Sequence, residues 1–325
     1  MRRRPTLSCT YVVTLDSDAG RSDVQALAHY LSTINHECDV VVVDAAGATV
    51  FADRERVLRW VARHVAVRAH HRFADGSIDI VHAASDFCGT EKVIVATCES
   101  RYSAAEVHAL CEMLDRFEVV EPEEYVDPLP WWGGVDAGRL LLHRGIEQIP
   151  ESGSTFAFRR SAYRPMRASD DRGTGGPVKR LVMQGAEVHE AHGVFVRRVP
   201  RHFNAWLRLR PHEAAADLVA PAKSAFFLAA VPILIVLAIL GGLQVAAGYA
   251  GVMACGSVLL ALRGRAGAGK FFPLHACLFA PLWIVERSIS VYWALFDRLR
   301  AAKTGTDSGR STRGGRTSGA TAING

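Results

Sequence analysis

Residues 40–44 read VVVVD, an almost unbroken run of valine that ends in an acid. Uninterrupted β-branched runs of this length are typical of strands buried on both faces of a parallel sheet. Around this run, apolar stretches alternate with amphipathic ones. The pattern predicts strands over residues 9–15, 40–44, 92–96 and 118–120, and helices over residues 22–34, 54–71 and 104–116. The sequence therefore predicts an α/β domain over residues 1–220, with a mostly parallel sheet covered by helices.

Two acids follow predicted strands: Asp44 closes the valine run, and Glu99 lies just past the strand at 92–96. The carboxyl ends of parallel strands meet at one edge of a sheet, where α/β proteins bind their ligands. A carboxylate at that edge can accept hydrogen bonds from a nucleoside or hold a divalent cation beside a diphosphate. Either residue alone is equally well explained as a solvated acid or a helix cap.

Residues 224–262 contain no Asp, Glu, Lys, Arg or His. A helix of about 20 apolar residues crosses a bilayer, so this stretch is long enough for two. It predicts a membrane hairpin with helices over about 224–242 and 245–262. The turn is expected near residues 244–248, supplied by Gly241, Gly242 and Gly248. Lys and Arg flank both ends of the hairpin, which places both ends and the preceding domain in the cytoplasm, in a multi-pass protein of the plasma membrane.

A third apolar stretch, residues 271–297, contains Glu286 and Arg287. A charge at mid-bilayer costs about 2.5–3.5 kcal/mol, so we expect a helix that lies in the cytoplasmic interface or dips in and returns. A third span is the alternative, and the membrane domain would cover residues 221–300. Residues 301–325 are rich in Gly, Ser, Thr and Arg and predict a disordered basic tail. The formal net charge of +5 gathers near these segments, which indicates contact with anionic membrane lipid and not with nucleic acid.

Five segments together resemble the bacterial family 2 glycosyltransferases. They are VVVVDAA (40–46), VIVATCESRY (93–102), FEVVEPEEYVDPLPWWGGVDAGRLLLHRG (117–145), GSTFAFRR (153–160) and FNAWLRLRPHEAAADLVAP (203–221). The resemblance extends over about residues 8–300 and implies an A-type nucleotide-sugar transferase fold followed by membrane helices. It also implies an enzyme that passes a sugar from a nucleotide-diphosphate donor to a lipid-linked or cell-envelope polysaccharide acceptor, with a divalent metal, Mg²⁺ or Mn²⁺.

The same resemblance implies roles for residues of the donor site. Asp44 would contact the nucleoside of the donor, and Glu99 would bind the metal that holds the diphosphate. Arg101 follows the metal motif in the donor site. Asp136 and Arg139 would complete the donor site from a helix that runs on past the acceptor.

The catalytic residues implied by the resemblance are Arg210, which would stabilise the leaving diphosphate, and Asp170 or Asp171 as the base. The chain departs from the family pattern here. Thr97 stands at the first acid of the D-x-D metal motif, and residues 172–176 stand where the family has an acidic pair. These departures keep a second hypothesis open: a catalytically degenerate relative that binds a nucleotide sugar or a partner enzyme.

Other motifs have simpler interpretations. A membrane-tethered dinucleotide-binding enzyme would need G-x-G-x-x-G after the first strand, which residues 16–20 lack. His70 and His71 have no cysteine or acid at a recognised metal spacing, so we expect exposed histidines. Trp131 and Trp132 could stack on a sugar ring or serve as interface or core aromatics. The acidic run Glu121, Glu123 and Glu124 predicts a solvated loop.

Overall fold

The computed structural model describes residues 5–15, 19–72, 78–146, 155–164, 176–217 and 221–311. The chain forms two compact units. The first comprises Met1–Arg201 together with Ala254–Pro281, and the second comprises His202–Met253 together with Leu282–Gly325. The division into residues 1–220, 221–300 and 301–325 stays a prediction.

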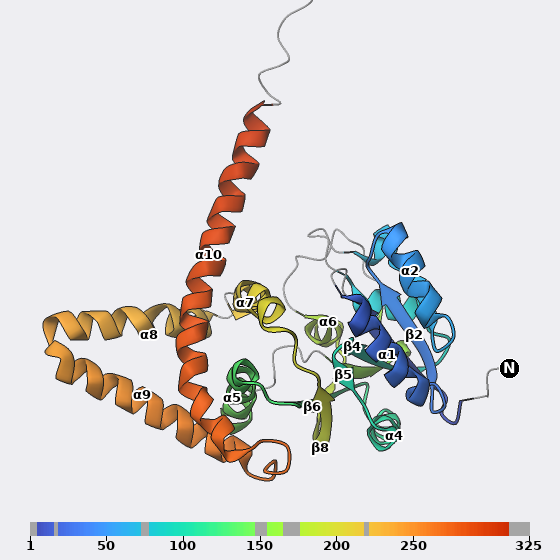
Figure 1. Cartoon of the computed structure of the whole chain (residues 1–325), viewed down its shortest axis with the longest axis horizontal. Helices are drawn as coiled ribbons and strands as arrows, with labels where there is room; N and C mark the ends of the chain where they lie inside the picture. Colours follow the sequence, from blue (N-terminus) through green and yellow to red (C-terminus); the bar gives the residue numbers. More distant parts are fainter. Residues whose placement is uncertain are drawn as a thin grey trace, which may run out of the picture. The chain divides into compact units, whose positions relative to one another are not determined.

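The first unit is built on a single sheet of eight strands among the described residues, in the order β3-β2-β1-β4-β7-β6-β8-β5 (Figure 1). The strands β3, β2, β1 and β4 run parallel, β7 runs antiparallel to both β4 and β6, and β8 runs parallel to β6. The strands are β1 (Cys9–Leu15), β2 (Asp39–Asp44), β3 (Arg63–Ala66), β4 (Lys92–Thr97), β5 (Ser100–Arg101), β6 (Val119–Val126), β7 (Phe156–Arg159) and β8 (Val188–Arg198).

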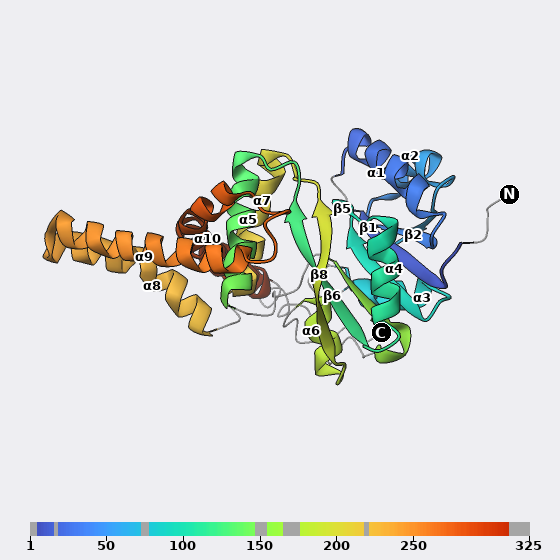
Figure 2. The ribbon, with the colours of Figure 1, turned by 90° about the horizontal axis from the view of Figure 1, so that it is seen from below.

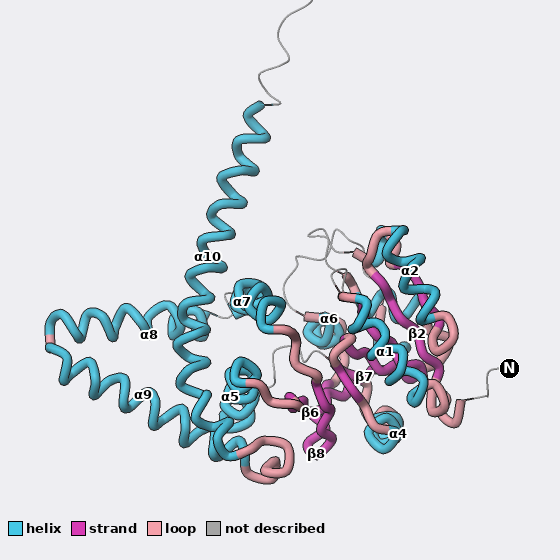
Figure 3. The backbone as a smooth tube through the Cα atoms, viewed as in Figure 1, coloured by secondary structure: helices cyan, strands magenta, loops and turns pink. Residues whose placement is uncertain are grey.

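Helices cover both faces of this sheet, as the tube of Figure 3 shows. They are α1 (Arg21–Ile34), α2 (Ala48–Leu58), α3 (Ile80–Phe87), α4 (Ala104–Met113) and α6 (Pro177–Met183). A further helix, α5 (Trp131–Ile146), contacts β6 and the 3₁₀ segment η4 (Leu274–Phe279). In β2, Val40 and Val42 pack in one core cluster with α1, α2 and α4, whereas Val41 and Val43 pack in another with α3 and α6. Because successive strand side chains point to opposite faces, an all-valine strand is buried on both. The α/β class is therefore confirmed.

Residues 54–71 do not form the single helix that the sequence predicts. The helix α2 ends at Leu58, next to α1 (Figure 2), the chain then forms the edge strand β3, and a 3₁₀ turn η1 (Ala69–His71) follows. In β3, Val65 pairs with Val43 of β2. The prediction is wrong because β3 spans only four residues, too short to show an alternating pattern against the preceding helical one.

The acidic run after residue 120 is also a strand, not the solvated loop that we expected. It belongs to β6, where Glu121 and Glu124 are 4% and 8% exposed. Glu123 pairs with Arg144 of α5 and with His192 of β8. Glu123 is tolerated in the sheet because neighbouring elements supply cations for it.

The helix α5 packs against the second half of α9 (Gly242–Arg265) through glycines, all within the first unit. A Cβ atom on Gly145 would overlap the backbone carbonyl of Leu260, and one on Gly264 would overlap the carbonyl of Leu141. Arg144 adds a hydrogen bond from its Nε to the carbonyl oxygen of Gly264 at 2.8 Å. Small residues allow helix backbones to approach closely, so these positions leave no room for a side chain.

The second unit contains α7 (Phe203–Asp217), α8 (Pro221–Leu240), the first half of α9 and most of α10 (Ala280–Ser311). Among the described residues, three segments are long and apolar enough to cross a membrane: Ala222–Leu240, Gly242–Arg265 and Leu274–Phe296. The first two match the predicted hairpin, but its turn lies at Gly241 and Gly242, not near residues 244–248, which are helical. Gly242 adopts φ +79°, a left-handed conformation that glycine reaches without strain.

The third segment keeps its charges bonded within the second unit. The Arg287 guanidinium lies over the ring of Trp283 and contacts Glu213 at 3.5 Å, and Ser290 donates to Glu286 at 2.6 Å. Whether this segment spans or lies in the interface stays a prediction. The helix α10 continues to Ser311, into the segment where we expected a disordered tail, and residues 312–325 lie outside the described residues.

Candidate functional site

The ends of β2 and β4 lie at the same edge of the sheet, on either side of β1. In the strand register, Asp44 faces Leu15 and Thr97 faces Thr14. Neighbouring strands lie about 4.8 Å apart, which puts Asp44 and Thr97 roughly 10 Å from each other across β1. Glu99 follows two residues after Thr97. The edge therefore brings together the two acids that the sequence singled out.

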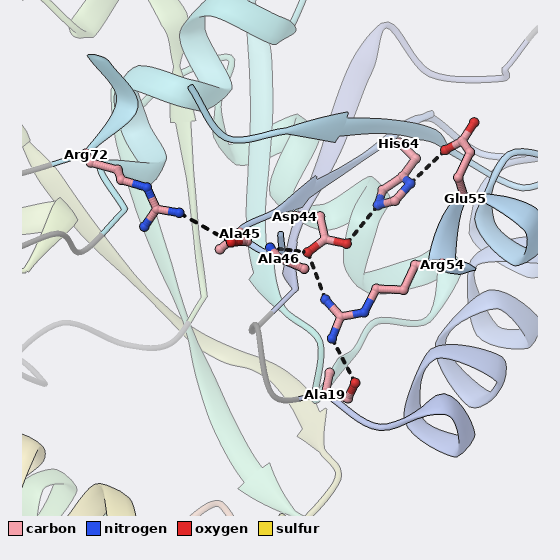
Figure 4. Close-up of polar contacts among 8 residues, drawn as sticks. All are labelled: Ala19, Asp44, Ala45, Ala46, Arg54, Glu55, His64 and Arg72. Carbon is pink, nitrogen blue, oxygen red and sulfur yellow. Dashed lines mark hydrogen bonds and ion pairs between the residues drawn. The ribbon is translucent and has the colours of Figure 1, made fainter. Parts of the chain in front are cut away.

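Asp44 is completely buried and is held by three donors (Figure 4). Its Oδ1 accepts from Arg54 Nη1 and from the Ala46 amide, both at 2.8 Å, and its Oδ2 lies 3.0 Å from His64 Nε2. The other ring nitrogen of His64 lies 2.7 Å from Glu55. Burial alone would raise the pKa of Asp44, but the His64 and Ala46 hydrogen bonds and the Arg54 charge outweigh it and lower the pKa. Asp44 is thus an ionised residue that fixes the strand end.

Glu99 is paired with Arg201, an arginine that follows the strand β8. The Nε atom of Arg201 lies 2.8 Å from Glu99 Oε1, and the Glu99 side chain is 13% exposed. Its other oxygen, Oε2, is buried without a hydrogen-bond partner among the described residues. Burial alone would raise the pKa of Glu99, but the charges of Arg201 and Arg198 lower it. The contact between Glu99 and Arg201 could not be predicted from the sequence, because the two residues are far apart along the chain.

Arg101 contacts the backbone on either side of Glu99 and the ring of Tyr30. Its Nη1 donates to the carbonyl oxygens of Cys98 at 2.6 Å and Ser100 at 2.9 Å, and its guanidinium lies 4.8 Å from the ring centre of Tyr30. Arg101 therefore closes the turn that carries Glu99. Its role towards a donor stays a prediction.

The helix α5 contributes the remaining predicted polar residues of the first unit. Asp136 is 6% exposed, and both Asp136 and Arg139 have contacts within the protein. At the start of α5, Trp132 Nε1 donates to the carbonyl oxygen of Arg201 at 3.1 Å, whereas Trp131 is 62% exposed. Trp132 therefore holds the backbone of the arginine that faces Glu99, and sugar stacking stays a prediction for both tryptophans.

Of the three predicted catalytic residues, the structure describes Arg210 alone. Arg210 belongs to the second unit, where it is buried, contacts Glu213 at 3.0 Å and lies 4.4 Å from the ring centre of Trp206. Asp170 and Asp171 lie outside the described residues. The roles of these three residues stay predictions.

A divalent metal fits poorly at Glu99. The carboxylate offers one open oxygen, and the other already faces the Arg201 cation, which would repel a metal ion. Among the described residues, the one group of three or more possible ligands gathers instead around His70, His71, His82 and Asp86.

Comparisons with known proteins find no matching family model and no matching curated protein. Similar solved structures include mannosyltransferase PcManGT from Pyrobaculum calidifontis with GDP-Man and Mn²⁺, at 17% identity and TM-score 0.48 over 90% of this chain and 88% of that one. Glucosyl-3-phosphoglycerate synthase from Mycobacterium tuberculosis with Mn²⁺ and UDP is similar at 12% identity and TM-score 0.41, over 66% and 79%. A putative nucleotide-diphospho-sugar transferase from Desulfovibrio desulfuricans G20 gives 12% and 0.36, over 56% and 79%. These likenesses are weak and assign this chain neither an activity nor a residue role.

Proposed function

We propose that this protein is a membrane-bound glycosyltransferase that moves a sugar from a nucleotide-diphosphate donor to a lipid-linked or cell-envelope acceptor at the cytoplasmic face. The observation that carries the proposal is the Glu99–Arg201 pair at the carboxyl end of β4, beside the strand end that Asp44 fixes. This is the edge where α/β proteins bind nucleotides. The candidate membrane helices support an acceptor that is itself attached to the membrane.

In the proposed reaction, an acceptor hydroxyl attacks the anomeric carbon of the donor. The bond from that carbon to the diphosphate oxygen breaks, and a carboxylate takes the hydroxyl proton. Asp170 and Asp171 are the candidates for that base. A guanidinium has five N–H donors, so Arg201 can hold Glu99 and a diphosphate oxygen together. Arg210 is the second candidate cation for the leaving group.

The proposal makes Asp44 a positioning residue, because its carboxylate is fully buried among its own partners. It would hold the backbone of residues 44–46 in place for the nucleoside. Arg101 would similarly hold the turn of Glu99, and Asp136 and Arg139 would complete the site from α5. The metal role of Glu99 is retained only as the weaker alternative to Arg201, because the residues around it fit a metal poorly.

The test uses the full chain purified in detergent, with UDP-, GDP- and dTDP-sugars in the presence of Mg²⁺, Mn²⁺ or EDTA. A donor at 100 times its Kd should add about 2.7 kcal/mol of stability and raise the thermal midpoint. We expect one donor to do so and to release its nucleoside diphosphate. Glu99→Gln should slow that release at least about 100-fold, whereas Glu112→Gln, an exposed acid of α4, should not. No stabilisation by any donor would contradict the proposal.

The degenerate relative remains the second candidate, favoured by two observations. Thr97 stands at the first metal-motif position, and its hydroxyl lies 3.2 Å from Ser100 Oγ. Glu99, the acid at the last position of the metal motif, is already paired with Arg201. Stabilisation by a donor without any release of the nucleoside diphosphate, across all acceptor-containing membrane extracts, would favour this candidate over the enzyme.

A further inference from the structure

Three histidines and an aspartate of the first unit form a second cluster of polar side chains. His70 and His71 lie in η1, and His82 and Asp86 lie one turn apart on α3. One ligand atom from each of the four residues lies within 4.8 Å of the others. From the sequence we expected His70 and His71 to be exposed histidines, because no cysteine or acid stands at a recognised metal spacing. That is wrong for His71, which is completely buried, and both histidines contact Asp86.

The contacts within the cluster converge on one carboxylate oxygen. Asp86 Oδ2 lies 2.9 Å from His71 Nε2 and 3.3 Å from His70 Nε2. The ring centres of the three histidines lie 4.1 Å, 5.3 Å and 5.7 Å apart. Ligand atoms about 2.0–2.2 Å from a tetrahedral ion lie about 3.3–3.6 Å from one another. The four ligand atoms, which lie within 4.8 Å of one another, would need to move only slightly closer together to surround such an ion.

Residues behind the cluster hold α3 and its histidine in place. The Nδ1 atom of His82 lies 3.1 Å from the hydroxyl of Tyr163, which leaves its Nε2 for a ligand. Asp79 caps α3 by accepting the backbone N–H of His82 at 3.1 Å, and it forms a buried ion pair with Arg180 of α6. The contact between His82 Nδ1 and Tyr163 is typical of metal-bound histidines, whose second ring nitrogen forms a hydrogen bond with a neighbouring group.

We propose that His70, His71, His82 and Asp86 bind one first-row divalent cation of the zinc class. Three neutral imidazoles and one carboxylate form a complete four-ligand set for Zn²⁺. Imidazole also suits Cu²⁺, Ni²⁺ and Co²⁺, whereas Mg²⁺ prefers oxygen ligands and should bind poorly. The site therefore differs in metal preference from any metal held by a donor diphosphate, and its occupancy can be measured without a nucleotide.

Metal binding requires one local change at His71. Its Nδ1 accepts the Arg68 amide at 3.3 Å, so the proton of the neutral ring sits on Nε2. An ion on Nε2 moves that proton to Nδ1 and gives up the Arg68 hydrogen bond, which is already long.

The ion would join η1 to α3 and act on the strand edge through the next residue. Arg72, directly after His71, donates from Nη2 to the carbonyl oxygen of Ala45 at 3.4 Å. Ala45 follows Asp44 at the end of β2. A structural ion here would therefore fix the segment that supports this strand end.

The experiment uses the full chain in detergent, freed of any polyhistidine tag and stripped with EDTA, in the absence of nucleotide. Zn²⁺ alone is titrated by calorimetry, and Co²⁺ is added in parallel to record its visible d–d absorption. We expect one bound equivalent, a tetrahedral cobalt spectrum and no comparable binding of Mg²⁺. His70→Ala should weaken zinc binding by at least about tenfold, since a ligand is lost.

The matched control is His108→Ala, because His108 of α4 is 45% exposed, close to the 51% of His70, and is outside the cluster. It should bind zinc like the original chain. The proposal is overturned if the original chain binds no zinc equivalent, or if zinc affinity is the same in His70→Ala, in Asp86→Asn and in the control. Because no nucleotide is present, failure of the transferase proposal would leave this result unchanged.

Discussion

Arg201 places its guanidinium 2.8 Å from the Glu99 carboxylate at the end of β4. The resemblance to family 2 glycosyltransferases led us to expect a metal cation beside this acid, and the structure has an arginine cation there. Both would offer positive charge to a diphosphate, but an arginine does so without any added ion.

The first prediction concerns Arg201 as the cation of the proposed reaction. Arg201→Met should reduce release of the nucleoside diphosphate at least about 100-fold, because one preorganised donor to the leaving group is lost. Turnover of the original chain should persist in EDTA. The control is Arg197→Met on β8, a half-exposed arginine that pairs with Asp127. Complete loss of turnover in EDTA would instead favour a metal at Glu99.

The second prediction concerns the buried partner of Asp44. Arg54→Met should destabilise the first unit by about 3–5 kcal/mol, because it leaves a buried carboxylate with less compensation. Arg56→Met on the same helix should change stability by no more than about 0.5 kcal/mol, since its side chain is 77% exposed. Thermal unfolding of the two variants, followed by tryptophan fluorescence, compares them. Equal midpoints would show that the Asp44 ion pair contributes little.

The third prediction is a pH dependence of stability from Asp44. Its pKa is lower in the folded protein than in an unfolded chain, because the His64 and Ala46 hydrogen bonds and the Arg54 charge outweigh burial, so the folded state favours the ionised form. The stabilisation is therefore complete above the unfolded pKa of about 3.9 and is lost as the pH falls through the folded pKa. The thermal midpoint should fall less steeply below about pH 4 in Asp44→Asn than in the original chain.

The control for this pH series is Asp53→Asn, because Asp53 is 73% exposed on α2. The thermal midpoint of Asp53→Asn should depend on pH below about 4 as that of the original chain does. Other carboxylates also contribute to this dependence. If Asp44→Asn and Asp53→Asn lose stability in parallel as the pH falls, then Asp44 is not the group that titrates.

The fourth prediction concerns the glycine contacts between α5 and α9. Gly145→Ala and Gly264→Ala should each destabilise the first unit by about 1–3 kcal/mol, because the added methyl group meets a backbone carbonyl. Gly256→Ala, on α9 with nothing near its Cβ position, should be neutral or slightly stabilising. Thermal midpoints in the same detergent give the comparison. A loss in Gly256→Ala equal to that of the other two would attribute the effect to the helix alone.

Features carried by a continuous run of residues could be predicted from the sequence. The valine run of β2 reveals a strand with two buried faces, and the uncharged stretch 224–262 reveals a helical hairpin. Asp44 and Glu99 could be placed at one sheet edge because parallel strands end together. The strand β3 could not be found, since its four residues, two exposed and two partly buried, carry too little pattern.

Features that depend on distant residues could not be predicted. Local spacing contains no information that Arg201 returns to Glu99, or that His71 meets α3. The one available signal was the spacing of His82 and Asp86, four residues apart and hence on one helix face. This spacing indicates a metal site only together with His70 and His71, which the fold brings beside that helix face.

The backbone contact between α5 and the last turns of α9 has a consequence for which substrates can be reached. A protein tethered by a flexible linker samples a wide shell of distances from its anchor. Here the last turns of a candidate membrane helix belong to the same compact unit as the sheet. If α9 crosses a bilayer, the Glu99 edge would therefore keep a constant distance from that bilayer. The length of an acceptor's headgroup, rather than its local concentration, would then decide whether it is used.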